Sequence, residues 1–214
     1  MSNPTEPNFT PPDGEAPKTT SVASESVMSF LNDKLAHLVT WQGQPIPALM
    51  RLIEDHPDVL PEWDEPTRER LIRTECCAVC GRALMKYRFA MFLGVENAVN
   101  RVTKCPLLHL HCGSWLVTSI WLPKDVPVLL EGVQTHRVTE GQIQAPGAYD
   151  GLPPLSVMWL VGGVPAHAAQ VNAWLQSYHK RTEPTCANPD EALGLAACMD
   201  WAVKFLLPVE TAGD

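Results

Sequence analysis

Two pairs of metal-binding residue types, 28 residues apart in the middle of the chain, constrain the fold more than any other feature. Cys77 and Cys80 are separated by two residues, and His109 and Cys112 repeat that spacing. Tetrahedral zinc binds thiolates and neutral imidazoles in sets of this kind. The first pair is typical of a tight turn, whereas the second pair would lie on one face of the opening turn of a helix. We therefore predict a closed, structural Zn²⁺ site formed by Cys77, Cys80, His109 and Cys112.

Other residues nearby compete for the same coordination positions. His111 is the most credible replacement for His109, whose spacing to the following cysteine mirrors the first pair. Cys76 breaks the two-residue spacing, and Cys105 lies outside the expected helical turn. The sequence alone does not decide whether one of these residues replaces a predicted ligand. Ordinary buried cysteines without a metal are the alternative to the whole site.

Composition limits the class of protein. The chain has 214 residues, 45% of them hydrophobic, so a sizeable core is available. Seven cysteines are an odd number, which does not suit a disulfide framework and fits a reducing compartment. No apolar run reaches the roughly 18 residues of a membrane span, and no secretory signal is visible at the first residues. We expect a cytoplasmic protein. Its net charge of −8 argues against non-specific coating of nucleic acid.

The chain divides into four parts by composition. Residues 1–25 are rich in Pro, Ser, Thr and Glu and are expected to form a disordered tail. A helical N-terminal segment is expected over 26–73 and the zinc-binding module over 74–123. The remainder, 124–214, reads as an α+β region packed on that module.

Hydrophobic periodicity predicts individual elements within these parts. Helices are expected over Ser26–Val39, Pro47–Glu54, Glu65–Arg73, His109–Trp121, Ala166–Lys180 and Pro189–Leu207. Strands are expected over Tyr87–Leu93, Val126–Leu130 and Leu155–Val161, with a strand or turn over Asn97–Lys104. Asp64 and Asn188 are predicted N-caps. The fold class that follows is α+β, with a zinc knuckle, a β-hairpin and a helix in that order.

The residues around the two pairs resemble a family of small uncharacterised zinc-finger-like proteins from actinobacteria and bacteriophages. The resemblance rests on Cys77-Ala-Val-Cys80-Gly-Arg-Ala-Leu84, Asn100-Arg-Val102 and Pro106-Leu-Leu-His109-Leu-His-Cys112. It covers about 50 residues, and the chain departs from the family pattern at Leu107 and Leu122. The order of elements is similar to that of treble-clef zinc modules. The resemblance implies a phage or mobile-element protein and no particular activity.

Local charge suggests a second function. Between the outer two cysteines, five basic residues face one acidic residue, a local balance of +4. These basic residues are Arg82, Lys86, Arg88, Arg101 and Lys104. A basic hairpin with Tyr87 and Phe89 available for stacking could bind nucleic acid, although a solvated hairpin face explains the same pattern.

Motifs for catalysis are weak, and we predict no catalytic residues. The H-x-E of zinc deaminases and the H-E-x2-H of zinc proteases do not occur. A treble-clef nuclease would require His111 with Asn97 or Asn100 at unconvincing spacing. Three hypotheses follow. The leading one is a non-enzymatic, zinc-stabilised accessory protein with an unknown protein partner. The second is a nucleic-acid-binding protein, and the third is a divergent nuclease.

Overall fold

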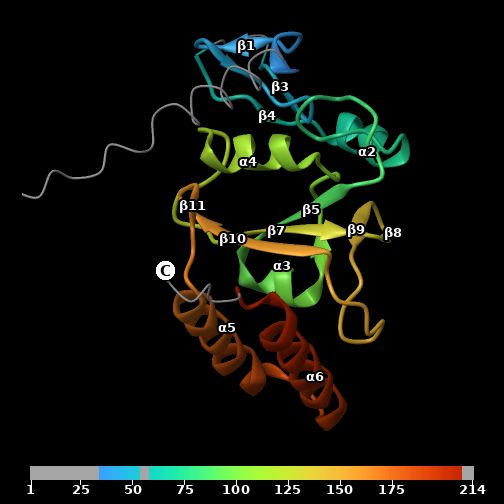
Figure 1. Ribbon diagram of the computed structural model, residues 1–214, viewed down its shortest axis with the longest axis vertical. Helices are drawn as coiled ribbons and strands as arrows, with labels where there is room; N and C mark the ends of the chain where they lie inside the picture. Colours follow the sequence, from blue (N-terminus) through green and yellow to red (C-terminus); the bar gives the residue numbers. More distant parts are fainter. Residues whose placement is uncertain (1–33, 54–57, 209–214) are drawn as a thin grey trace, which may run out of the picture.

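The computed structural model describes residues 34–53 and 58–208, and it is a mixed α+β fold. An antiparallel sheet with the strand order β11-β10-β7-β5 forms its middle layer (Figure 1). Helix α4 lies on one face of this sheet, and helices α3, α5 and α6 lie on the other (Figure 1). The predicted α+β class is confirmed. The predicted tail, 1–25, lies outside the described residues.

The element bounds are as follows. The main sheet contains β5 (Arg88–Leu93), β7 (Val128–Val133), β10 (Ser156–Val161) and β11 (Val164–Pro165). The shorter strands are β1 (Thr40–Trp41), β2 (Gln44–Pro45), β3 (Met50–Arg51), β4 (Glu62–Trp63), β6 (Val102–Thr103), β8 (Arg137–Thr139) and β9 (Gln142–Gln144). The helices are α2 (Glu65–Arg73), α3 (Gly94–Asn100), α4 (Leu110–Thr118), α5 (Ala168–Thr182), the 3-10 turn η1 (Glu183–Thr185) and α6 (Pro189–Leu206).

Most of the predicted helices and strands downstream of residue 64 are present, and both predicted caps are confirmed. The Asp64 carboxylate accepts a hydrogen bond from the Thr67 backbone N–H at 3.1 Å. The Asn188 side-chain oxygen accepts one from the Glu191 N–H at 3.0 Å. Each bond satisfies a backbone donor that the first turn of a helix leaves free, which stabilises the helix by about 1 kcal/mol.

One predicted helix is wrong, one predicted strand or turn is only partly present, and one predicted helix is largely untested. The helix expected over Pro47–Glu54 is replaced in its described part by a turn and strand β3. The strand or turn expected over Asn97–Lys104 begins as the end of helix α3 and continues as β6. The helix expected over Ser26–Val39 lies mostly outside the described residues, and within them the chain already turns from residue 36. The N-terminal segment therefore contains short strands as well as helix α2.

Alternation along the sheet divides the core in two. Leu130 of β7 and Met91 of β5 face the α4 side and belong to one buried cluster, which also contains three of the cysteines of the predicted zinc site. Leu129 and Phe92 face the other side and pack with α5 and α6. Because successive side chains of a strand point to opposite faces, two continuous apolar layers form from one sheet.

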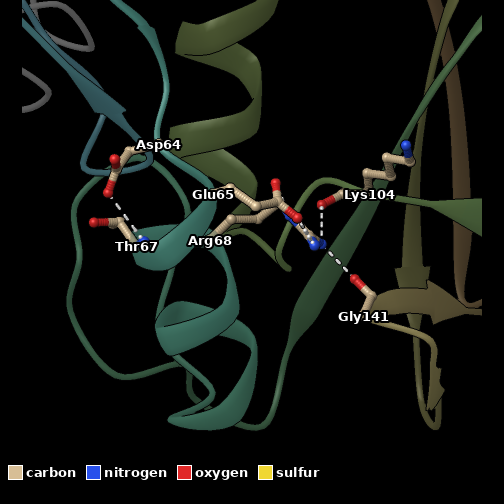
Figure 2. A network of polar contacts seen from close by, with 6 residues as sticks. All are labelled: Asp64, Glu65, Thr67, Arg68, Lys104 and Gly141. Atoms are coloured by element: carbon tan, nitrogen blue, oxygen red, sulfur yellow. Dashed lines mark hydrogen bonds and ion pairs between the residues drawn. The ribbon is translucent and has the colours of Figure 1, made fainter.

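Arg68 connects helix α2 with two loops of the sheet layer (Figure 2). Its guanidinium forms a bidentate pair with Glu65 one helical turn earlier. It also donates to the backbone carbonyls of Lys104, at 3.4 Å, and of Gly141. Arg68 is buried, so these bonds satisfy donors that would otherwise be desolvated without partners. The contact to Lys104 fixes the chain shortly before it enters the second pair of predicted ligands.

A second arginine is buried on the α6 side of the sheet. Arg101 is 4% exposed and forms an ion pair with Glu131 of β7, which is 2% exposed. The Arg101 guanidinium carbon lies 4.9 Å from the ring centre of Phe92 and 4.7 Å from that of Trp201. Its Nε–H also donates to the Pro146 carbonyl at 2.9 Å. Arg101 thus joins α3, β7, α6 and the loop after β9.

Gly147 lets that loop approach Arg101, and we expect its replacement to destabilise the fold. A Cβ at this position would lie 2.7 Å from Arg101 Cγ, whose side chain cannot move away without breaking the buried pair. Gly147→Ala should lower the free energy of unfolding by about 1–3 kcal/mol, the usual cost of overpacking. Urea denaturation followed by tryptophan fluorescence would measure this change.

Gly194→Ala is the matched control for this prediction. A Cβ at Gly194, inside α6, would meet only the hydroxyl of the exposed Tyr149 at 3.0 Å. That side-chain end can move, and alanine favours a helix over glycine by about 1 kcal/mol. Equal losses of stability in the two variants would contradict this account of Gly147.

Candidate metal centre

The first ligand pair lies on a tight turn between two short extended segments. Cys76 and Ala83 form an antiparallel bridge, and Cys77 N–H donates to the Arg82 carbonyl at 2.8 Å. Gly81 follows the second cysteine with φ +67°, a left-handed conformation that glycine adopts without strain. The turn therefore places Cys77 and Cys80 on the same side, as the spacing predicts.

The second pair lies at the start of helix α4. His109 occupies the N-cap position and Cys112 lies in the first turn. Phe89 of β5 and Leu108 form an antiparallel bridge with two hydrogen bonds of 2.9 and 2.8 Å. This single bridge takes the place of the predicted hairpin, because β5 pairs with β7 and β6 pairs with β9. It brings the start of α4 to the turn that carries the first pair.

The geometry of the four side chains fits a tetrahedral ion. One ligand atom from each of Cys77, Cys80, His109 and Cys112 lies within 4.8 Å of every other. His109 Nδ1 lies 3.4 Å from Cys80 Sγ and 3.9 Å from Cys112 Sγ. Tetrahedral zinc with bonds of about 2.3 Å to sulfur and about 2.0 Å to nitrogen requires ligand-to-ligand separations of about 3.5–3.8 Å. Small shifts of these side chains would bring all the separations into this range, so the group is able to hold a metal ion of this size.

The hydrogen bonding of His109 selects the nitrogen that faces the thiols. Its Nε2 lies 3.3 Å from the backbone carbonyl oxygen of Ala83. A carbonyl only accepts hydrogen bonds, so this contact requires the proton on Nε2. In the neutral ring Nδ1 then carries the free lone pair, and Nδ1 is the atom directed at Cys80 and Cys112. A partner of this kind on the outer nitrogen is typical of histidines that bind metal.

Electrostatics of the group favour a cation. The thiols of Cys112 and Cys77 donate toward Cys80, which holds the pKa of Cys80 far below its usual range. The complementary contacts from Cys77 and Cys80 raise the pKa of Cys112. A divalent ion would favour the thiolate form at all three positions. Three thiolates and a neutral imidazole around a divalent ion would leave one net negative charge. The partial positive charge of the α4 N-terminus lies beside Cys112 and offsets part of it.

None of the competing residues belongs to the group that the structure assembles. The His111 ring stacks on the outside of the His109 ring, with centroids 5.2 Å apart and planes 6° from parallel. Cys76 is partly exposed, and its thiol donates to the Thr74 carbonyl at 3.5 Å. Cys105 is fully buried, and desolvation raises the pKa of its thiol.

Supporting residues from the N-terminal segment were missed by sequence reasoning. His37 Nε2 lies 2.9 Å from the Cys80 carbonyl. The backbone N–H groups of Ala48 and Leu49 donate to Val79 and to the residue before it, at 2.8 and 2.9 Å. These contacts join positions about 30 to 43 residues apart and leave no local signal in the sequence. They pair the polar backbone of a turn that is itself buried.

The predicted basic surface is incomplete in the structure. Arg101 is buried in its pair with Glu131, so it is not available to nucleic acid. Arg88 is partly buried and forms an ion pair with Glu75 at 3.0 Å. Arg82, Lys86 and Lys104 are exposed. Nothing in the contacts of these residues assembles a shared groove or a recognition helix among the described elements.

Comparison of the chain with protein-family models, curated proteins and solved structures returned no match. The resemblance to phage and actinobacterial proteins therefore stays a prediction. Within the ranges that the structure describes, no helix is both long and apolar enough to cross a membrane.

Proposed function

We propose that Cys77, Cys80, His109 and Cys112 hold a structural Zn²⁺ ion that stabilises a non-enzymatic protein-interaction or accessory protein. The observation that carries the proposal is the closed Cys3His group, whose three cysteines are buried and whose ligand atoms lie within 4.8 Å of one another. Four protein ligands complete a tetrahedral zinc shell, and no position is left for the water or substrate that a catalytic zinc requires.

The surface around the metal centre supports an interaction role. Met85 and Tyr87 are 73% and 68% exposed, and they follow the ligand turn directly in the chain. Leu110, next to His109, is also exposed. Zinc would fix the ligand turn and the start of α4. The backbone that carries these exposed side chains would then be rigid, which lowers the entropy cost of binding a partner. Tyrosine and methionine are enriched at protein interfaces because they offer large, adaptable apolar area.

A comparison of captured partners tests the interaction role. The wild-type protein, loaded with zinc, is used as bait beside a Met85→Ser/Tyr87→Ser double variant. A Leu193→Ser variant is the control, because Leu193 is also 68% exposed but lies on α6. We expect proteins that the wild type and Leu193→Ser retain and the double variant loses. Identical capture by all three proteins would refute a partner surface at the metal centre.

Nucleic-acid binding is the competing hypothesis, and charge reversal separates it from ours. If the basic hairpin bound DNA, Arg82→Glu with Lys86→Glu would weaken retention, and the dependence on salt concentration would become less steep. We expect the double variant and the wild type to show the same DNA retention. Arg88 and Arg101 are already paired with Glu75 and Glu131, so they do not add to a basic surface beside Arg82 and Lys86. Electrophoretic mobility shifts of short duplex and single-stranded DNA at two salt concentrations would check this. Salt-dependent binding that the double variant loses would favour the competing hypothesis.

A further inference from the structure

The buried ion pair leaves one carboxylate oxygen without a donor. Arg101 donates to Glu131 Oε1, whereas Glu131 Oε2 is buried and has no hydrogen-bond partner among the described residues. A buried acceptor without a donor loses its hydrogen bonds to water and gains none in the protein, which destabilises the fold. Native proteins rarely keep a buried oxygen unpaired without a structural or functional reason.

Glu131 lines the smaller of two cavities that share lining residues; we call the pair the Glu131 cleft, the smaller cavity its inner part and the larger its outer part. Its inner cavity has a volume of about 10 Å³, and Glu131, Gly132 and Val133 are among the residues that line it. The outer cavity has a volume of about 300 Å³. Both are lined by Thr135, Pro146 and Leu152. A space of about 10–15 Å³ holds one water-sized group, so the inner part admits a single polar group from a ligand in the outer part.

The charges around the Glu131 cleft are already balanced. Arg101 compensates Glu131 at the inner end, and Arg137 pairs with Asp150 at 3.3 Å in the outer cavity. Burial lowers the pKa of His136, which favours its neutral form. A charged ligand group would therefore enter without a counter-ion, at a high desolvation cost. A neutral group that donates a hydrogen bond carries no such cost.

We propose that the Glu131 cleft binds a small neutral polyol or sugar, one hydroxyl of which enters the inner cavity and donates to Glu131 Oε2. Thr135 and Gln144 are among the residues that line the outer cavity, and they offer further donors and acceptors for the other hydroxyls of the ligand. A volume of about 300 Å³ is at the lower end of the range for small-molecule sites, which suits a chain or ring of five or six carbons. This site is on a different part of the fold from the metal centre and does not depend on zinc.

Titration of the zinc-loaded, ¹⁵N-labelled full-length protein with xylitol tests the proposal. We expect the backbone amide resonances of Gly132, Val133, Gln134 and Thr135 to shift in a saturable way. Pentylammonium chloride, which is similar in length but charged, should leave these resonances in place. Shifts produced by pentylammonium and not by xylitol would overturn the assignment of a neutral ligand.

Two tryptophan variants distinguish the cleft from the general surface. Leu152→Trp places a large ring in the lining of both cavities and should weaken xylitol binding by at least about tenfold, equivalent to about 1.4 kcal/mol. Leu155→Trp is the control, because Leu155 is equally exposed and does not line the cleft. Equal binding by both variants would overturn the proposal. So would a long-lived water signal at Gly132 that xylitol does not displace, because one internal water would then be the only partner of Glu131 Oε2.

Discussion

Cys112→Ser will fail to bind zinc and will lose the native structure around α4. Zinc binding to sites of this kind contributes about 10–16 kcal/mol to folding, whereas a typical domain is stable by about 5–15 kcal/mol in total. Cys112 is fully buried and lies in the cluster that packs α4 against the sheet. Loss of the ion would also leave the thiols of Cys77 and Cys80 buried without it. Amide hydrogen exchange should show protection lost throughout α4 and β5, and native mass spectrometry should show no bound zinc.

Cys186→Ser is the control for this variant. Cys186 is a partly exposed cysteine that follows η1, and its thiol makes a long contact of 3.7 Å to the Thr182 carbonyl. This variant should keep one zinc ion per chain and wild-type exchange rates. If Cys112→Ser retained wild-type protection in α4, the metal centre would not be what holds this face of the sheet together.

Arg101→Met will cause the largest loss of stability on the opposite face of the sheet. Removing one partner of a buried ion pair costs about 3–5 kcal/mol, because the other charge stays buried without compensation. Methionine keeps part of the apolar contact with Phe92 and Trp201, so the loss should report mainly the charge. Residue 101 has a left-handed backbone conformation, with φ +62°. Arginine and methionine both carry a Cβ, so the replacement does not change the backbone strain at this position. Urea denaturation would give the free energy of unfolding.

A double replacement separates charge from packing. Arg101→Met combined with Glu131→Leu removes both charges, and such changes are often neutral or stabilising. We expect the double variant to be more stable than Arg101→Met alone. Surface substitutions usually change the free energy of unfolding by no more than about 0.5 kcal/mol. If both variants were within that range of the wild type, the buried pair would not contribute to stability.

The pH dependence of the Arg101→Met variant has a definite sign. Desolvation raises the pKa of Glu131, and Arg101 opposes that shift. Without Arg101 the pKa rises further, so the folded variant binds a proton more tightly than its unfolded chain does. Stability then falls as the pH rises from the unfolded pKa through the folded one. The difference between wild type and variant should therefore be smaller near about pH 5 than near about pH 7. If the difference in stability were the same at both pH values, the loss in Arg101→Met would come from packing and not from the charge of Glu131.

The Cys3His group was predictable because its information is local. Two short spacings place Cys77 with Cys80 and His109 with Cys112, and the turn and helix start that carry them also have local signals. The spacing to Cys112 favoured His109 over His111, but the physical cause of that choice is not visible in the sequence. It depends on the Ala83 carbonyl, which orients one imidazole toward the thiols, and on the stacking that leaves the other outside.

The wrong predictions fall where long-range contacts override local preference. The segment after Pro47 has a helical pattern, but the N–H groups of Ala48 and Leu49 bond to the ligand turn instead. Helix α3 has Leu93 at its N-cap position and no side-chain cap, so its stability comes from burial of Ala98 and Val99. Neither effect can be read from neighbouring residues.

Arg101 shows the same limit for function. In the sequence it is one of several basic residues in a short stretch, which suggested a nucleic-acid surface. Its partners, Glu131 and Trp201, follow it by 30 and 100 residues. Only the folded chain shows that its charge is used inside the core.

The coordination of the metal in purified protein tests the central claim most directly. X-ray absorption at the zinc edge of protein purified under reducing conditions should show three sulfur ligands at about 2.3 Å and one nitrogen at about 2.0 Å. Native mass spectrometry of the same sample should give one zinc ion per chain. A shell of oxygen ligands, a different ratio of sulfur to nitrogen, or protein that is folded and free of metal would contradict a closed Cys3His centre at Cys77, Cys80, His109 and Cys112.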